Sequence, residues 1–319
     1  MFNELYYWDT FFTNEGLLLD GRVDLAKGNT DDILYMVDRF GYMFNGNRTW
    51  YASRSQPPYL SAMVRAVYRH VPDTAWLSGA YDLLTREYDF WQTERITPCG
   101  LNRYWCDAPD TLVTEMIATA GKRLGDDFSS REDRVKFSLD CVAECESGWD
   151  FNPRFDRRCG DFCPLDLNAH LYRMEKDMAA FSRILGREDG RWEEAAAKRK
   201  ELILKYMYDP IRKQFFDWDY VREQRSEVLS AAVFTLLFDG VLDSGDEVVA
   251  ALESLETRYG LAVCANQPYP YQYQWSWPYS WPPEIFMAVK GLADYGFHAQ
   301  ARSLAKKYIE TAEIGRAHV

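Results

Sequence analysis

The feature that most constrains the fold is the spacing of apolar residues at helical intervals. Between residues 167 and 185 the apolar side chains recur every three or four positions, which places them on one face of a helix: Leu167, Leu171, Met174, Met178, Phe181 and Leu185. Asp166 can cap the start of this helix, and Gly186 can end it. The sequence therefore predicts an amphipathic helix here.

Similar patterns extend along most of the chain. They predict a helix over 30–40, another that opens at Pro57-Pro58, and further helices over 74–92, 129–146, 191–207, 227–239, 245–258 and 283–311. Residues 214–220 are typical of one arm of a short β-hairpin. We find no βαβ alternation and no glycine-rich phosphate loop. The pattern predicts one all-α domain of paired helices, arranged either as a ring (an α/α toroid) or as a solenoid.

Four long segments lie between the predicted helices: 41–56, 97–112, 151–165 and 261–282. Long ordered loops on a rigid scaffold usually carry function. If several of them meet at one end of a ring of helices, they form a site there.

Composition and charge restrict the partners. The chain is 16% aromatic, and flat aromatic faces suit the C–H faces of sugar rings as well as a helical core. A formal net charge of −12 argues against nucleic acid, which needs clustered cations. No apolar run is long enough for a membrane span, and the first residues show no signal-peptide pattern, so the compartment stays open.

The seven cysteines include two C-x3-C pairs, Cys141/Cys145 and Cys159/Cys163. Such pairs could hold zinc, but Cys141 and Cys145 fall in a predicted helix rather than in a metal-binding turn. An odd number of cysteines also argues against a disulfide framework. We expect free thiols and no metal site.

The candidate for chemistry is Asp150, which lies between Trp149 and Phe151 after a flexible Ser-Gly step. Cleavage of a glycosidic bond needs a carboxyl group that stays protonated, and apolar neighbours raise a carboxyl pKa. A helix cap or an ion-pair partner is the alternative interpretation.

Other polar residues near aromatic ones have two interpretations. Asp9, after Trp8, could hold sugar hydroxyls or cap a helix, and Arg54 and Gln56 could point into a cleft or lie on the surface. The stiff segment 274–283, with three Trp and three Pro, is either core packing or a sugar platform. The four His residues are scattered and suggest no catalytic or metal cluster.

Seven segments in one order resemble the trehalases of glycoside hydrolase family 37. Residues 2–11 (FNELYYWDTF) and 274–283 (QWSWPYSWPP) are similar to the two family signatures. Between them lie 45–48 (NGNR), 53–58 (SRSQPP), 101–105 (LNRYW), 147–151 (SGWDF) and 166–168 (DLN). The resemblance covers residues 2–310.

The resemblance implies an (α/α)6 toroid that hydrolyses α,α-trehalose with inversion and without a cofactor. Asp150 matches the general acid of the family. The residues implied to bind the sugar are Trp8, Asp9, Asn45, Arg54, Ser55, Gln56, Gly148, Gln274 and Trp275.

The chain departs from the family pattern in three places. Met1 and Ala108 stand where the motifs have Arg, and Ser276 stands where the second signature has Asp. Fewer donors to sugar hydroxyls weaken discrimination, so a close α-glucoside is an alternative to trehalose.

The resemblance also implies a general base, a Glu that we expect beyond residue 319. We therefore expect residues 1–313 to form a single catalytic domain that is incomplete at its C-terminal end. Residues 314–319 (IGRAHV) match the translation of a common sequencing adapter, and we expect a non-native tail there. A sugar-binding toroid without catalysis is the main alternative function; a sugar isomerase would need a His base within the motifs.

Overall fold

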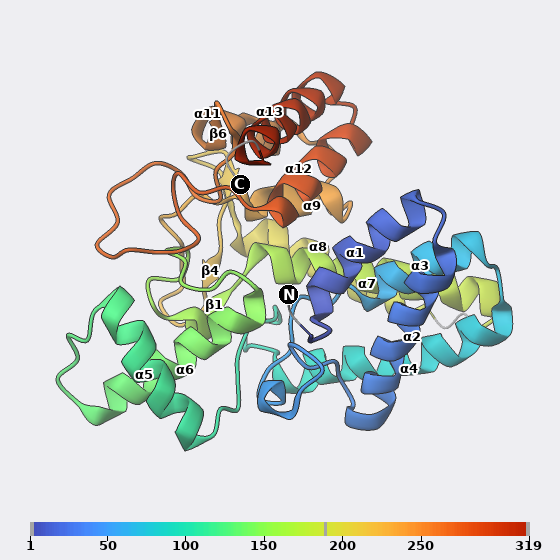
Figure 1. The fold of residues 1–319 in the computed structure, drawn as a ribbon, viewed down its shortest axis with the longest axis horizontal. Coiled ribbons are helices and arrows are strands. Elements are labelled where there is room, and N and C mark those ends of the chain that lie inside the picture. The colour runs from blue at the N-terminus through green and yellow to red at the C-terminus, as the bar shows by residue number, and fades with distance from the viewer. Residues whose placement is uncertain (1–2, 188–189, 317–319) are drawn as a thin grey trace.

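The computed structural model describes residues 3–187 and 190–316, and most of these residues are helical (Figure 1). The long helices are α1 (Tyr7–Leu19), α2 (Val23–Phe40), α3 (Leu60–His70), α4 (Thr74–Glu94), α5 (Asp110–Leu124), α6 (Arg131–Ser147), α7 (Leu165–Leu185), α8 (Arg191–Tyr206), α12 (Pro282–Asp294) and α13 (His298–Arg316). Shorter ones are α9 (Thr235–Phe238), α10 (Asp246–Ala250) and α11 (Leu252–Leu255), with 3-10 turns η1 (Thr49–Tyr51), η2 (Cys159–Asp161) and η3 (Ala231–Phe234). The prediction of an all-α chain is confirmed.

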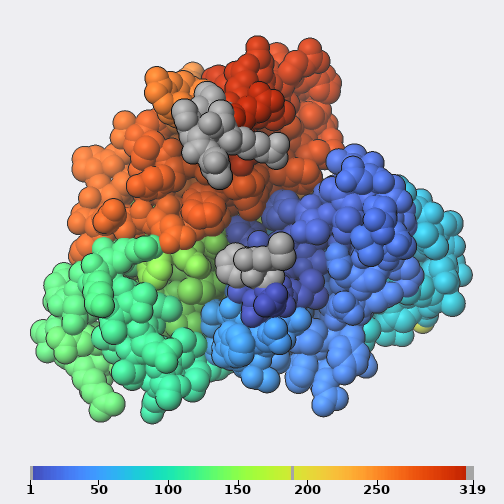
Figure 2. Space-filling view, in the orientation of Figure 1, coloured from blue at the N-terminus to red at the C-terminus, as the bar shows by residue number. Residues whose placement is uncertain are grey.

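Consecutive helices pack in pairs around a shared core. α1 packs on α2, α3 on α4, α5 on α6, α7 on α8 and α12 on α13. α7 is the most interior helix and also contacts α3, α4 and α9, because it buries residues along nearly its whole length. In Figure 2 the N-terminal part, the α5–α6 pair and the segment around α12 meet near the middle of one face.

Within the described ranges, three small antiparallel sheets lie between the helices. β1 (Phe162–Cys163), β4 (Trp218–Asp219) and β5 (Gln224–Arg225) form one, in the order β1-β4-β5. β2 (Tyr208–Asp209) pairs with β3 (Gln214–Phe215), and β6 (Glu256–Thr257) with β7 (Gly260–Leu261). The expected single hairpin arm over 214–220 was wrong, because its two halves, β3 and β4, pair in different sheets.

Several expected helix boundaries also change. The residue that precedes α7 is Pro164, and Asp166 does not cap the helix because its carboxylate accepts hydrogen bonds from Arg154 and Tyr104. Gly186 ends α7 in the left-handed conformation, as predicted. The expected helix 283–311 is divided between α12 and α13 at Gly296, whose φ of +85° interrupts helical geometry.

Tertiary pairing overrides helical periodicity near residue 230. Ser230 forms an extended bridge with Cys264, and the Ala231 N–H donates to the Val263 carbonyl, so the expected helix 227–239 is shortened to η3 and α9. The expected helix 245–258 is divided into α10 and α11 and ends at Leu255, directly before β6. Residues 110–124, part of which we expected to be loop, form α5.

The expected tail lies mostly at the edge of the described chain. Residues 314–316 are the last turn of α13, and 317–319 lie outside the described residues, as does Met1. None of the helices in the described ranges is long and apolar enough to cross a membrane.

Candidate active site

A cavity of about 840 Å³ lies where α1, the 41–56 loop, the end of α6, the 261–282 loop and the start of α12 meet. Its lining includes nine of the ten residues singled out from the sequence: Trp8, Asp9, Asn45, Arg54, Gln56, Gly148, Asp150, Gln274 and Trp275. The structure therefore gathers around one space residues that are far apart in the sequence, from the start of α1 to the loop before α12.

Asp150 lies just past the C-terminus of α6. The helix ends at Gly148 in the left-handed conformation, Trp149 is buried, and Phe151 has a φ of +58°, so the chain turns sharply on both sides of Asp150. Burial raises the pKa of the Asp150 carboxyl to about 6, although the neighbouring Cys145 thiol and the charges of Arg54 and Arg123 favour its charged form. Desolvation thus outweighs two nearby cations, and the group holds its proton in mildly acidic solution.

The lack of a side chain at Gly148 allows Trp8, which lines the cavity, to lie close to the backbone that carries Asp150. A Cβ placed on Gly148 would lie 2.6 Å from Cζ2 of Trp8. The φ of Gly148 is +79°, which other residues rarely adopt. Glycine here therefore serves two purposes: it ends α6, and it lets the Trp8 indole lie against the backbone.

Arg54 is a buried cation without a carboxylate partner among the described residues. Its side chain contacts Ser53 Oγ through Nη1 at 3.4 Å and lies over the Tyr51 ring, and its Nε has no hydrogen-bond partner. A buried guanidinium usually pairs with an anion, because losing water is costly for a charge. The unused donors of Arg54 are therefore available to a ligand in the cavity.

Trp8 and Asp9 lie in the first turn of α1 and line the cavity. The backbone N–H of Trp8 donates to Gln56 Oε1 at 3.1 Å, and this hydrogen bond connects the helix to the 41–56 loop. Partial burial raises the pKa of Asp9. No side-chain cap precedes α1, whose capping position is Tyr6, so Asp9 is not the helix cap considered from the sequence.

Stacked indoles form one wall of the cavity. Trp275 stacks on Trp281 with ring centroids 4.3 Å apart and an interplanar angle of 6°, and on Trp149 at 5.4 Å. Trp275 is buried, so the segment 274–283 contributes both to the core and to the cavity wall. The two interpretations of this segment are compatible.

Ser55 is the exception among the residues singled out. It is fully buried, its Oγ donates to the Met43 carbonyl at 2.6 Å, and its N–H donates to Glu146 Oε1 at 2.7 Å. Arg54 and Gln56 line the cavity, while the residue between them faces away from it, as expected in an extended segment.

Glu146 is a central residue that we did not identify from the sequence. Its buried carboxylate accepts hydrogen bonds from Arg95 Nε and Nη2 and from the N–H groups of Ser55 and Trp105, all between 2.7 and 3.0 Å. One side chain on α6 therefore anchors the 41–56 loop and the 97–112 loop four residues before Asp150. Its partners are 41 to 91 positions away, so no local motif indicates this role.

The cysteines are all free thiols. Cys141 and Cys145 lie in α6, as expected, while Cys99 and Cys163 lie with their sulfur atoms 3.8 Å apart. Within the described ranges, no cluster of three or more His, Cys, Asp or Glu side chains is arranged to hold a metal ion.

The sequence model of the family described as Trehalase matches residues 1–315. The chain belongs to the trehalase family of glycoside hydrolases. This membership confirms the resemblance to glycoside hydrolase family 37.

Solved structures of related enzymes share the fold. Neutral trehalase Nth1 from Saccharomyces cerevisiae superposes with a TM-score of 0.84 at 29% identity, and the match covers 96% of this chain and 64% of the yeast chain. The GH63 mannosylglycerate hydrolase from Thermus thermophilus matches with a TM-score of 0.68 at 18% identity over 96% of this chain and 84% of its own. These matches confirm the (α/α)6 toroid, of which this trehalase-family chain covers a part.

Proposed function

We propose that the protein hydrolyses trehalose or a close α-glucoside, with Asp150 as the general acid. The observation that carries the proposal is the pKa of about 6 at a carboxyl that lines the cavity. A general acid must hold a proton in the Michaelis complex and release it during bond cleavage, and this pKa suits both steps near neutral pH.

In the proposed reaction the Asp150 carboxyl donates its proton to the glycosidic oxygen as the C1–O bond breaks. A water molecule attacks C1 from the opposite face and gives its proton to a base, so the configuration at C1 inverts. Arg54, Asp9 and Asn45 are proposed to hold the hydroxyls of the sugar, because each offers a polar group at the cavity.

The base is not assigned to a described residue. Within the described ranges the cavity lining has one further carboxylate, Asp9. The family resemblance implies that Asp9 binds sugar hydroxyls. This observation keeps one alternative, a sugar-binding toroid that does not turn over its ligand.

One experiment separates these possibilities. Glucose release and calorimetric binding are measured with trehalose for the wild type, for Asp150→Asn and for Asp243→Asn, whose exposed carboxyl lies outside the cavity. The proposal expects binding by all three proteins and release by the wild type and Asp243→Asn alone. Binding without release by the wild type would support the binding-only alternative, and unchanged release by Asp150→Asn would remove Asp150 from its role.

A further inference from the structure

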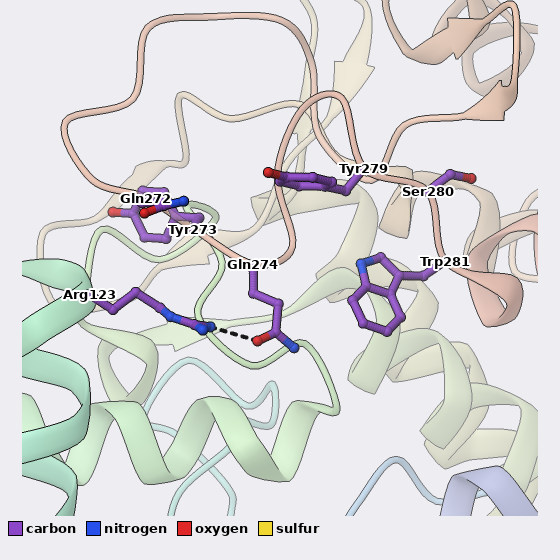
Figure 3. Close-up of a pocket in the computed structure, with 7 residues that line it drawn as sticks. All are labelled: Arg123, Gln272, Tyr273, Gln274, Tyr279, Ser280 and Trp281. Carbon is purple, nitrogen blue, oxygen red and sulfur yellow. Dashed lines mark hydrogen bonds between the residues drawn. The ribbon is translucent and has the colours of Figure 1, made fainter. Parts of the chain in front are cut away.

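A second cavity of about 440 Å³ adjoins the first. Its lining comprises Arg123, Gln272, Tyr273, Gln274, Tyr279, Ser280 and Trp281, drawn in Figure 3. Gln274 and Trp281 line both cavities, so the two spaces share a wall on the 261–282 loop. A substrate held at Asp150 could therefore extend into the second cavity.

Arg123 reaches this cavity from the last turn of α5. Its Nη1 donates to Gln274 Oε1 at 2.6 Å (Figure 3). Its guanidinium lies over the Phe151 ring at 4.8 Å from the centroid. Phe151 directly follows Asp150, and Arg123 is close enough to lower the pKa of Asp150. The cation is therefore positioned on the boundary between the acid and the second cavity.

Arg123 forms no ion pair with a carboxylate of the described residues. None of its described contacts is an ion pair, and the lining of the second cavity consists of this cation, amides, hydroxyls and aromatic rings without an Asp or Glu. Arg123 is exposed, and it differs in this respect from its neighbours Arg157 and Arg134, which pair with Asp side chains. The remaining N–H groups of Arg123 can bind an anion.

We propose that the second cavity binds the leaving group of the substrate and that Arg123 selects a leaving group bearing a carboxylate. The inference rests on the proposed function, in which Asp150 protonates the oxygen between the two halves of the substrate. A single planar guanidinium fits a carboxylate through two parallel hydrogen bonds. Tyr279 and Trp281 supply flat faces against which the uncharged body of the leaving group packs.

The test uses two α-D-glucosides that differ only in charge, with 4-carboxyphenyl and 4-carbamoylphenyl leaving groups. The ratio of kcat/KM for the acid to that for the amide is measured for the wild type, Arg123→Gln and Arg123→Lys. We expect the ratio to fall about tenfold in Arg123→Gln. It should fall less in Arg123→Lys, which keeps the charge but loses the two parallel N–H donors of the guanidinium. Because the comparison is a ratio between proteins, the different intrinsic reactivity of the two phenols cancels.

Arg131→Gln is the matched control. Arg131 is an exposed arginine at the N-terminal end of α6, whereas Asp150 follows the C-terminal end. Its replacement changes the net charge by the same amount as Arg123→Gln, and the kcat/KM ratio should equal that of the wild type. High salt should reduce the wild-type ratio toward that of Arg123→Gln.

The outcomes separate this inference from the proposed function. Hydrolysis of both glucosides with a ratio that Arg123→Gln leaves unchanged would overturn the role of Arg123 and leave the glycosidase proposal standing. If no α-glucoside is hydrolysed, the glycosidase proposal fails, and calorimetric binding of the same pair decides: a preference for the acid that Arg123→Gln abolishes supports the inference, and equal or absent binding overturns it.

Discussion

The Trp8 indole lies directly against the backbone of Gly148, two residues before the proposed acid, at a distance that leaves no room for a Cβ. The nearest Trp8 atom is 2.6 Å from the position that a Cβ would take, so any side chain at residue 148 must displace the indole. The Trp8 indole, which lines the cavity, and the proposed acid are thus fixed relative to each other by one glycine.

Gly148→Ala should therefore weaken sugar binding and lower the stability by about 2–4 kcal/mol, through backbone strain and the displaced indole. Thermal unfolding and calorimetry with trehalose check this. Gly186→Ala is the control, because Gly186 has a φ of +65° but no atom of the described residues within 4 Å of the position that a Cβ would take. It should show the cost of the strain alone, about 1 kcal/mol, and normal binding. Equal effects of the two substitutions would rule out the contact with Trp8 as the cause.

Arg54→Met should stabilise the unliganded protein by about 1 kcal/mol, because it removes a buried charge that makes no ion pair with the described residues. The same change should weaken trehalose binding by at least about tenfold, since it removes charged donors from the cavity. Denaturant unfolding and calorimetry measure the two effects. Arg95→Met provides the contrast: it leaves the Glu146 carboxylate buried without its cation and should destabilise the protein. A loss of stability in Arg54→Met would mean that Arg54 has a structural role.

The pH dependence of turnover should follow Asp150. With a pKa of about 6, the acid is progressively deprotonated above that pH, and kcat/KM should fall about tenfold for each further pH unit. Arg54, Arg123 and the Cys145 thiol all favour the charged form of Asp150. Arg123→Gln should therefore raise the pKa of Asp150, and the fall in kcat/KM should begin at a higher pH. A rate that is constant from pH 5 to pH 8 would contradict the assignment.

The same pKa predicts a stability effect that needs no turnover. The folded pKa lies above the unfolded value, so the contribution of Asp150 to stability is fully present below about pH 4 and is lost as the pH rises through about 6. Asp150→Asn does not undergo this loss. Relative to the wild type, the variant should gain roughly 2 kcal/mol between pH 4 and pH 7, as measured by urea unfolding. A difference that does not change with pH would show that the folded pKa is not raised.

Glu146→Gln should be among the most damaging single substitutions outside the cavity. It removes the charge that Arg95 and two backbone N–H groups share, and it places an amide N–H₂ opposite donors, at a cost of about 3–5 kcal/mol. Chemical unfolding measures it. Glu201→Gln, in the exposed pair with Lys198, should cost less than about 0.5 kcal/mol. A small effect of Glu146→Gln would mean that the two loops are held in place by other contacts.

The helices with a continuous apolar face could be predicted from the sequence, and those without one could not. α7 buries residues at every turn, and its periodicity is unmistakable. α5 buries only Val113, Ala120 and Leu124, because it packs at the periphery against α6, and so its pattern is weak. Where backbone pairing with a distant segment competes with helix formation, as at Ser230, periodicity predicted the wrong element.

The residues around the candidate site divide in the same way. Those carried by contiguous motifs, such as Trp8 with Asp9 and Gly148 with Asp150, could be singled out from the sequence, and they line one cavity. Glu146 and Arg123 were missed because their importance arises from partners 91 and 151 positions away, which no local pattern reveals. The burial that raises the pKa of Asp150 was foreseen from its two aromatic neighbours, but the opposing effects of Cys145, Arg54 and Arg123 depend on the fold.

The stack of Trp149, Trp275 and Trp281 gives the protein an intrinsic optical reporter. Indoles this close couple their electronic transitions, so their ultraviolet circular dichroism and emission depend on the mutual orientation of the rings. Trp275 and Trp281 also face the space in which a sugar would sit. Occupancy of the cavity can therefore be followed on the unlabelled protein by spectroscopy, in real time and for substrates that release no coloured product.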